Sequence, residues 1–197
     1  MISIAWLVLT GCTQLSEIPR TQSAIEQQLL VRAIERSLEK VDTTALDGKT
    51  VFLEVSVNSS HDVMDAAFLE NRIRAWLRER GVRLTEVAEG ADAEVQVFAP
   101  VLGTDRGESL VGIPSVPIPL INIPTPEIAL FKQVKNRGRS EVQLYEFEPK
   151  TGEFIRKTPV SVGESKYDNH LVLFFFKYTV SDIELTRDSA EASPSGD

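Results

Sequence analysis

Hydrophobic residues recur at helical spacing in two stretches of the chain. The second stretch runs from about Asp62 to Arg80 and ends at Gly81. Intervals of three and four residues place apolar side chains on one face of a helix, and the small polar residues before the second stretch supply helix caps. The pattern therefore predicts two amphipathic helices. In the first, which starts at Ser23, the apolar residues are Ile25, Leu29, Ala33, Ile34, Leu38 and Val41.

Shorter stretches are rich in β-forming residues, and most of them alternate between apolar and polar positions, as strands with one buried face do. The predicted strands are residues 51–57, 82–87, 93–99, 128–132, 140–148, 153–162 and 171–178. The turn PKTG between the fifth and the sixth predicts a β-hairpin with Gly152 in the left-handed conformation. The last segment, LVLFFFKY, is an almost unbroken apolar run, which predicts a central strand covered on both faces.

This order of elements predicts an α+β fold, an α/β sandwich in which one mixed sheet carries both helices on one face. The composition, with 42% hydrophobic and 25% charged residues, is typical of a globular protein. We expect a single domain at residues 23–187. The polar sequence DSAEASPSGD at residues 188–197 predicts a disordered tail.

A proline-rich segment interrupts the strand pattern. Residues 109–125, SLVGIPSVPIPLINIPT, contain four prolines and no charged residue. Proline at this density breaks helices and removes backbone donors from a sheet, so the segment is predicted to be a long extended loop. Three alternatives stay open: the loop covers the open face of the sheet, binds a protein partner, or dips into a bilayer. The candidate interaction residues are Ile113, Val116, Ile118, Leu120, Ile121 and Ile123.

The amino-terminal residues MISIAWLVL form an apolar run that is shorter than the ~20 residues of a membrane-spanning helix and suits the core of a secretory signal. The next residues, through Gly11 and Cys12, complete the sequence LTGC, which resembles the lipobox of bacterial lipoproteins. The resemblance implies a signal peptide at residues 1–11, cleavage between Gly11 and Cys12, acylation of Cys12, with palmitate among its acyl chains, and a tether at residues 12–22. The alternative is a buried amino-terminal strand with a core cysteine.

The resemblance also implies where the protein resides. A lipidated Cys12 anchors the chain to a membrane of the cell envelope. Thr13 follows it in place of an acidic residue, which by resemblance to enterobacterial sorting implies the outer membrane, with the domain facing the periplasm. Because Cys12 is the only cysteine, no thiol is left for a disulfide, a metal site or a nucleophile.

The net charge of −8 excludes several kinds of partner. A nucleic-acid partner requires a basic face, so none is expected. Electrostatic docking on anionic lipid headgroups is disfavoured for the same reason. The basic residues Lys132, Lys135, Arg137 and Arg139 form one local cluster, for which we expect a solvated loop rather than a phosphate site.

Catalytic and metal-binding patterns are weak. His61 follows two serines and precedes Asp62, which suggests a serine hydrolase, but helix capping explains the same residues better. His170 belongs to an Asp-Asn-His sequence that offers two metal ligands where three or four are needed, so a solvated turn is expected there. The acidic residues between Glu86 and Glu94 lack the spacing of a calcium loop. The sequence therefore predicts no enzyme and no cofactor.

Several longer segments resemble known envelope proteins. The segments KTVFLEVSV, RERGVRLTEVAEGADAEVQV and KTGEFI are similar to a periplasmic domain shared by the curli secretion lipoprotein, the lipoprotein activator of penicillin-binding proteins and the amino-terminal part of the Tol β-propeller protein. The segments LGTDRGESLVGIPSVPIPL and TPEIALFK resemble an uncharacterised family of bacterial lipoproteins. In the curli family a membrane-spanning hairpin stands where this chain has its proline-rich segment, so no functional residue carries over.

We therefore expect a membrane-anchored lipoprotein that acts as a non-catalytic binding or assembly module, with an envelope protein as its partner. Two alternatives remain. The first is an oligomeric component of an outer-membrane secretion apparatus, which the resemblance to the curli secretion lipoprotein favours, and the second is an envelope hydrolase.

Overall fold

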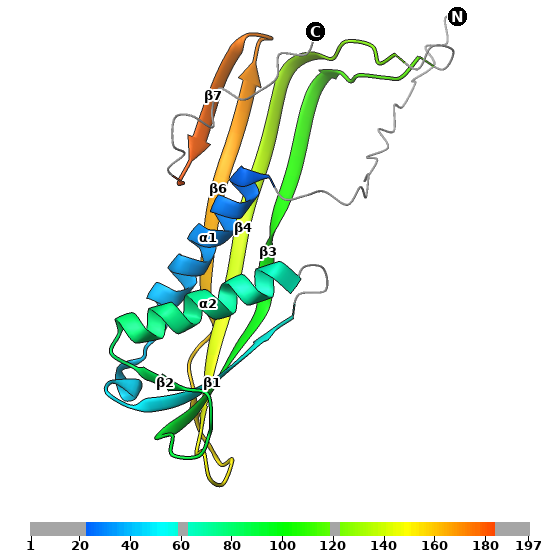
Figure 1. Ribbon diagram of the computed structural model, residues 1–197. Helices are drawn as coiled ribbons and strands as arrows, with labels where there is room; N and C mark the ends of the chain where they lie inside the picture. The colour runs from blue at the N-terminus through cyan, green and yellow to red at the C-terminus, as the bar shows by residue number, and fades with distance from the viewer. Residues whose placement is uncertain (1–22, 59–62, 119–122, 184–197) are drawn as a thin grey trace, which may run out of the picture.

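The computed structural model describes residues 23–58, 63–118 and 123–183. Seven strands form one open mixed sheet, and both helices lie on the same face of it (Figure 1). The predicted α+β fold, with one mixed sheet and two helices on one face, is therefore confirmed. Its elements are α1 (Ala24–Glu39), η1 (Thr44–Leu46), β1 (Thr50–Val57), α2 (Val63–Glu79), β2 (Arg83–Thr85), β3 (Ala93–Ile113), β4 (Ile128–Phe147), β5 (Phe154–Lys157), β6 (Ser161–Val172) and β7 (Phe176–Ser181).

The sheet has the strand order β2-β1-β3-β4-β6-β7, and β5 pairs with the last residues of β4. β1 is parallel to both β2 and β3, whereas all the other neighbours are antiparallel. The connection from β1 to β2 passes through α2, as parallel neighbours require. The parallel part and the two helices form the body of the molecule.

Helix α1 begins with a reciprocal cap. The side chain of Ser23 accepts a hydrogen bond from the backbone N–H of Glu26 at 3.3 Å, and the carboxylate of Glu26 accepts one from the backbone N–H of Ser23 at 2.7 Å. Its predicted apolar face is buried, with Leu29, Ala33 and Ile34 fully covered. Side chains of both helices share one core with β1, β3 and β4.

Two glycines of the sheet let α1 lie very close to it. A Cβ at Gly163 of β6 would stand 1.9 Å from the carbonyl oxygen of Ala33, and one at Gly138 of β4 would stand 2.5 Å from that of Leu29. Because the helix lies so close to the sheet, the Ser165 hydroxyl donates a hydrogen bond of 2.7 Å to the same Leu29 carbonyl. The α1 backbone therefore rests almost directly on the backbone of β4 and β6.

β3 and β4 are much longer than predicted, at 21 and 20 residues. The alternating pattern ends at Ala99, where β1 also leaves β3, but β3 continues to Ile113 alongside β4. Residues 109–113 and 128–139 therefore lie in strands, and the expectations of a loop from 109 and a solvated basic loop at 132–139 are wrong. A strand that is solvated on both faces need not alternate between apolar and polar residues, so hydrophobic periodicity does not reveal it.

The predicted central strand at residues 171–178 is also wrong. Leu171 and Val172 end β6, residues 173–175 form a turn, and Phe176 begins β7. Leu171 and Val172 are partly buried, but the apolar side chains from Leu173 on are exposed to solvent: Phe175, for example, is 68% exposed. An apolar run of this length is consistent with either a covered strand or an exposed apolar turn. In this protein it forms the exposed turn.

The strands beyond the body form what we refer to as the sheet extension: residues 101–113 of β3, 128–137 of β4, 166–172 of β6 and all of β7. Figure 1 shows these strands projecting away from β1 and β2, with α1 lying over their lower part.

Candidate interaction surface

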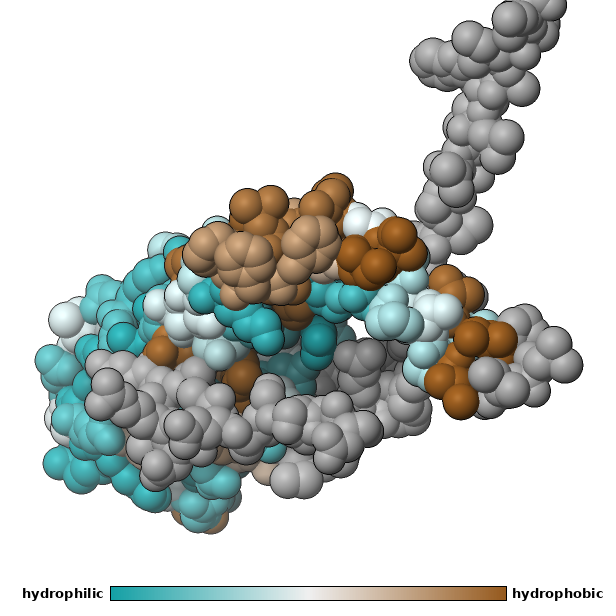
Figure 2. Space-filling model, turned by 90° about the horizontal axis from the view of Figure 1, so that it is seen from above, coloured by the Kyte–Doolittle hydropathy of each residue, from teal (hydrophilic) through white to brown (hydrophobic). Residues whose placement is uncertain are grey.

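Large apolar side chains gather where the strands of the sheet extension end. The register of the sheet brings them together, because Ile113 pairs with Ile128 and Val172 pairs with both Phe131 and Phe176. Seen from above in Figure 2, apolar side chains cover this part of the surface in two groups. We refer to the following exposed residues as the apolar end: Val111, Ile113, Val116, Ile118, Ile123, Ile128, Leu130, Leu173, Phe174, Phe175, Phe176 and Tyr178.

The first group belongs to the segment that links β3 to β4. Its backbone is paired with itself: the N–H of Ile118 donates to the carbonyl of Ile123 at 3.0 Å, and the N–H of Thr125 donates to that of Val116 at 2.9 Å. The Ser115 hydroxyl adds a hydrogen bond of 2.7 Å to the Thr125 carbonyl. The described part of the predicted loop is thus a narrow paired ribbon that bends away from the strand direction (Figure 1).

This ribbon contains most of the predicted interaction residues. Ile113, Val116, Ile118 and Ile123 are all exposed, from 38% to 59%. Because they face solvent, the ribbon does not cover the sheet, and that alternative is wrong for the described residues. Leu120 and Ile121 lie outside the described residues.

The second group forms the turn between β6 and β7. Leu173 and Phe174 have φ angles of 49° and 67°, a left-handed conformation that costs a large side chain roughly 1–2 kcal/mol. The Leu173 N–H donates to the carbonyl of Leu130 at 2.8 Å, which ties the turn to β4. Asparagine or glycine normally occupies such positions. A strained backbone at exposed apolar residues makes this turn a candidate for a functional role.

Aromatic rings continue this group down the hairpin. The ring centroids of Phe175 and Phe176 are 4.5 Å apart. The rings of His170 and Tyr178 stack in parallel planes at the same distance. His170 therefore lies in a strand against an aromatic ring, and the solvated turn expected for it is wrong.

The apolar end carries almost no charge. Residues 109–126, 128–131 and 169–176 contain no aspartate, glutamate, lysine or arginine. Two charged residues interrupt it: Glu127, which precedes Ile128, and the exposed Lys177. The ammonium of Lys132 contacts the carboxylates of Glu108 and Glu127 at 2.9 Å each. Burial alone would lower the pKa of Lys132, but the two carboxylates outweigh it and raise that pKa. The charges of Lys132 and Glu127 are thus held in an ion pair.

The remaining basic residues of the predicted cluster also take part in the sheet. Arg137 forms a two-pronged ion pair with Asp168 on β6, and this hydrogen bond lowers the pKa of the Asp168 carboxyl. Arg139 contacts Glu141 at 2.6 Å and Glu164 at 2.5 Å. These cations neutralise neighbouring carboxylates across the strands, so they do not form a phosphate site.

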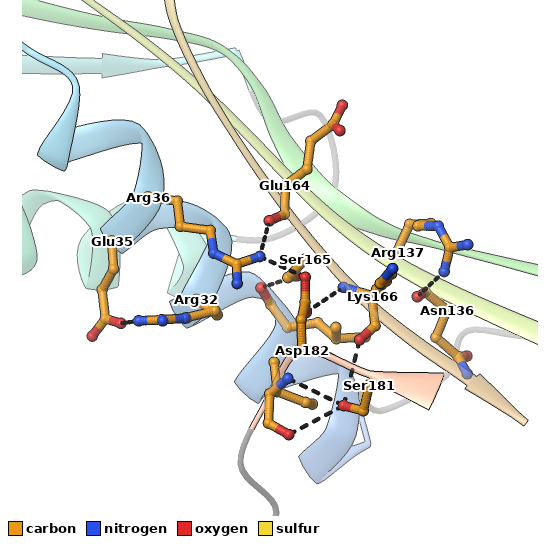
Figure 3. Close-up of polar contacts among 12 residues, drawn as sticks. Arg32, Glu35, Arg36, Asn136, Arg137, Glu164, Ser165, Lys166, Ser181 and Asp182 are labelled. Atoms are coloured by element: carbon orange, nitrogen blue, oxygen red, sulfur yellow. Dashed lines mark hydrogen bonds and ion pairs between the residues drawn. The ribbon is translucent and has the colours of Figure 1, made fainter. Parts of the chain in front are cut away.

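A polar junction holds the β6–β7 hairpin to α1 (Figure 3). The guanidinium of Arg36 donates to the carboxylate of Asp182 and to the carbonyl of Glu164, both at 2.6 Å. The other Asp182 oxygen accepts the backbone N–H of Lys166 at 2.8 Å. Burial alone would raise the pKa of Asp182, but these hydrogen bonds outweigh it and lower that pKa. The junction fixes the end of β7 to the body.

We expect Asp182→Asn to lower the free energy of unfolding by about 1 kcal/mol at pH 7, because it removes a partly buried, charge-assisted pair. Since the folded-state pKa of Asp182 is lowered, this stabilisation is present above the ordinary aspartate pKa of about 3.9 and disappears as the pH falls through the lower folded value. Urea denaturation of the parent and the variant at pH 7 and at pH 3 measures the loss of stability and its dependence on pH. Asp105→Asn, at an exposed aspartate of β3, is the matched control, and an equal effect at both sites contradicts the role of the junction.

Several predicted site residues lie elsewhere. Gly11, Cys12 and the serine-histidine sequence around His61 are outside the described residues. Asp92 of the acidic segment accepts the backbone N–H of Thr50 at 2.7 Å, so it closes a turn. Among the described residues no cluster of three or more potential metal ligands occurs, and neither described helix is long and apolar enough to cross a membrane.

Sequence reasoning missed residues 173–176 as part of the surface. The run FFF was the available signal, but its apolar character was equally consistent with a buried strand. The strained turn that distinguishes the two is visible only in the folded chain.

The fold defines the class of this protein: an α+β domain with an open mixed sheet, both helices on one face and an apolar projecting end. No family model matches the chain, and no curated protein matches it significantly. Among solved structures it is similar to the lipoprotein GNA1162 from Neisseria meningitidis, with 10% identity and a TM-score of 0.35 over 59% of this chain and 81% of that one. It is also similar to a protein from Helicobacter pylori described as a neuraminyllactose-binding hemagglutinin homolog, with 11% identity and a TM-score of 0.31 over 73% of each chain. At these TM-scores neither similarity carries an argument.

Proposed function

We propose that this protein is a lipid-anchored, non-catalytic binding module of the bacterial cell envelope, and that it binds through the apolar end. The observation that carries the proposal is the concentration of exposed apolar side chains at one end of the sheet, on segments with few charged residues. Contiguous apolar surface of this kind marks an interaction site. The LTGC sequence supports acylation of Cys12, and the absence of a metal-ligand cluster among the described residues is compatible with a binding role.

The test is site-specific photo-crosslinking in intact envelopes. A photoreactive residue in place of Phe175, which is 68% exposed, is expected to give adducts with an envelope component, whereas one in place of Val87, 58% exposed at the other end of the molecule, gives few. The same cells, fed an alkyne fatty acid, are expected to label the protein at Cys12, and Cys12→Ser removes the label and releases the chain from the membrane fraction. Crosslinks from Phe175 that stay within the chain contradict the binding surface. Labelling that persists in Cys12→Ser contradicts the anchor.

A second candidate function is an oligomeric component of an envelope secretion apparatus. It is supported by two sheet edges: among the described residues, β3 beyond Ala99 pairs only with β4, and β7 pairs only with β6. β7 runs opposite to β3, so β7 of one copy and β3 of the next are oriented for antiparallel pairing. Light scattering on the processed chain is expected to give the mass of several copies, and the mass of a single chain at all concentrations contradicts this candidate.

A further inference from the structure

We propose that the occupant of the apolar end is the surface of a lipid bilayer, the same membrane to which Cys12 tethers the chain. This inference rests on the proposed function and specifies its binding partner. In this arrangement the apolar end inserts into the boundary between headgroups and acyl chains, while the body remains in water.

The depth of the apolar end suits the bilayer surface. Its uncharged strand residues, 109–113 of β3 and 128–131 of β4, span about 15 Å at 3.3 Å per residue. That length is short of the ~30 Å hydrocarbon core. It exceeds the ~5–10 Å to which amphipathic segments enter the membrane interface. Glu127, which precedes Ile128, is the charged residue next to these strand residues, and its carboxylate is neutralised by the ammonium of Lys132 at 2.9 Å.

The shape of the end also favours a flat partner. In Figure 1 the ribbon between β3 and β4 bends sideways, and the β6–β7 turn reaches the same level as the ribbon at the top of the molecule. The two apolar groups of Figure 2 are therefore presented together on one side. A planar bilayer can contact both groups at once, and it needs no surface shaped to fit each of them.

Between the two sheet edges, much of the backbone of the ribbon and the turn is paired or lacks a donor, which matters in a medium without water, where each unpaired polar group is costly. In the ribbon, Ile118 pairs with Ile123, and Val116 pairs with Thr125 through both backbone and hydroxyl groups. Pro114, Pro117, Pro124 and Pro126 have no N–H to leave unpaired. In the β6–β7 turn the N–H of Leu173 is paired with Leu130. These features reduce the cost of removing the end from water.

The position of the tether is consistent with this occupant. β4 runs from the apolar end toward the body, and the start of α1 lies beside its earlier residues: the Leu29 carbonyl faces Gly138, and Ser37 faces Ser140 farther on. Helix α1 therefore starts on the side nearer the apolar end. Ten residues separate Gly138 from Ile128, a distance of about 33 Å in a strand. The eleven residues from Cys12 to Ser23 reach at most about 36–40 Å, so a lipid on Cys12 and the apolar end can occupy one bilayer face.

A protein partner explains these features less well. Protein interfaces combine apolar contacts with roughly one hydrogen bond per 100–200 Å² and are enriched in arginine. The apolar end has no arginine, and its exposed hydrogen-bonding side chains are few. The net charge of −8 further implies that binding is driven by apolar contact rather than by attraction to anionic headgroups, so it should be insensitive to salt.

The test uses the processed chain, residues 12–197 with Cys12→Ser, which contains every described element and no cysteine. Cosedimentation with phosphatidylcholine vesicles is compared with that of a variant carrying Leu173→Asn, Phe174→Gly and Phe175→Ser. Asparagine and glycine favour the left-handed turn, so this variant is expected to fold at least as well as the parent. The matched control carries Val87→Asn, Ile155→Ser and Val160→Asn, which removes three exposed apolar side chains away from the apolar end.

We expect the turn variant to lose at least tenfold in vesicle partitioning, the control to stay within twofold of the parent, and 0.5 M salt to leave the parent unchanged. An environment-sensitive fluorophore on Ile113→Cys is expected to shift to the blue with vesicles, whereas one on Val87→Cys is not. Parent protein that stays in solution overturns the inference, as does self-association that the turn variant abolishes without any vesicle binding. These outcomes leave the proposed function standing if Cys12 is acylated and Phe175 crosslinks to an envelope protein.

Discussion

Replacing Gly163 by alanine is expected to lower the free energy of unfolding by about 3 kcal/mol, at the upper end of the usual cost of overpacking. The new Cβ would lie 1.9 Å from the carbonyl oxygen of Ala33 and 2.5 Å from the backbone nitrogen of Ser37. Both atoms belong to the α1 backbone, which cannot rotate away as a side chain can. Helix α1 must therefore move off the sheet, and the buried contact between Ser37 and Ser140, now 3.1 Å, must lengthen.

Urea denaturation followed by circular dichroism measures this effect. Gly107→Ala is the matched control, because Gly107 also lies in a strand of the sheet but a Cβ there meets nothing within 4 Å. The control is expected to be neutral or slightly stabilising, since alanine reduces the entropy of the unfolded chain. Equal stability of the two variants would show that α1 does not rest on β6 as described.

Replacing Glu146 by alanine is expected to cost about 2 kcal/mol at pH 7. Glu146 is 5% exposed, and its two carboxylate oxygens contact Lys49 at 2.9 Å and Arg156 at 2.5 Å. Removing one member of a buried ion pair typically costs about 3–5 kcal/mol. We expect a smaller cost here, because Lys49 and Arg156 are roughly one-third exposed and are hydrated again once the carboxylate is gone.

The effect depends on pH in a definite direction. Burial alone would raise the pKa of Glu146, but the hydrogen bonds from Arg156 and Lys49 outweigh it and lower that pKa. The stabilisation is therefore complete above the ordinary glutamate pKa of about 4.3 and is lost as the pH falls through the lower folded value. Denaturation of parent and variant between pH 7 and pH 2.5 should converge at the acid end. Glu153→Gln, at an exposed glutamate in the β4–β5 turn, is the control, and a gap that widens toward acid pH contradicts the ion pair.

The body of the molecule is the part that the sequence predicts well. Ile34 and Leu38 in α1, and Val95 and Val97 in β3, are buried against one core, and burial on one face imposes the periodicity that reveals an element. The predicted turn at Gly152 is also confirmed, since its φ angle is 69°. The sequence could predict it because few residues other than glycine adopt the left-handed conformation.

The sheet extension is the part that it does not predict. Residues such as Asp105 and Arg106 are exposed, and Arg137 of β4 forms an ion pair with Asp168 of β6. Such pairs exist only once the register is set, and no local pattern specifies that register. For the proline-rich segment the sequence predicts an extended apolar loop and leaves its exposure open. Its paired backbone depends on contacts of Val116 with Thr125 and of Ile118 with Ile123, which no local pattern specifies.

The length of β3 and β4 has a mechanical consequence. A strand of 21 residues extends about 70 Å, and β4 pairs with β3 along most of that length. The molecule thus behaves as a stiff spacer that sets a fixed gap between the helix-bearing body and whatever the far end touches. Removing two residues from each strand would shorten the gap by about 7 Å and preserve which side chains face which way, because the side-chain period of a strand is two.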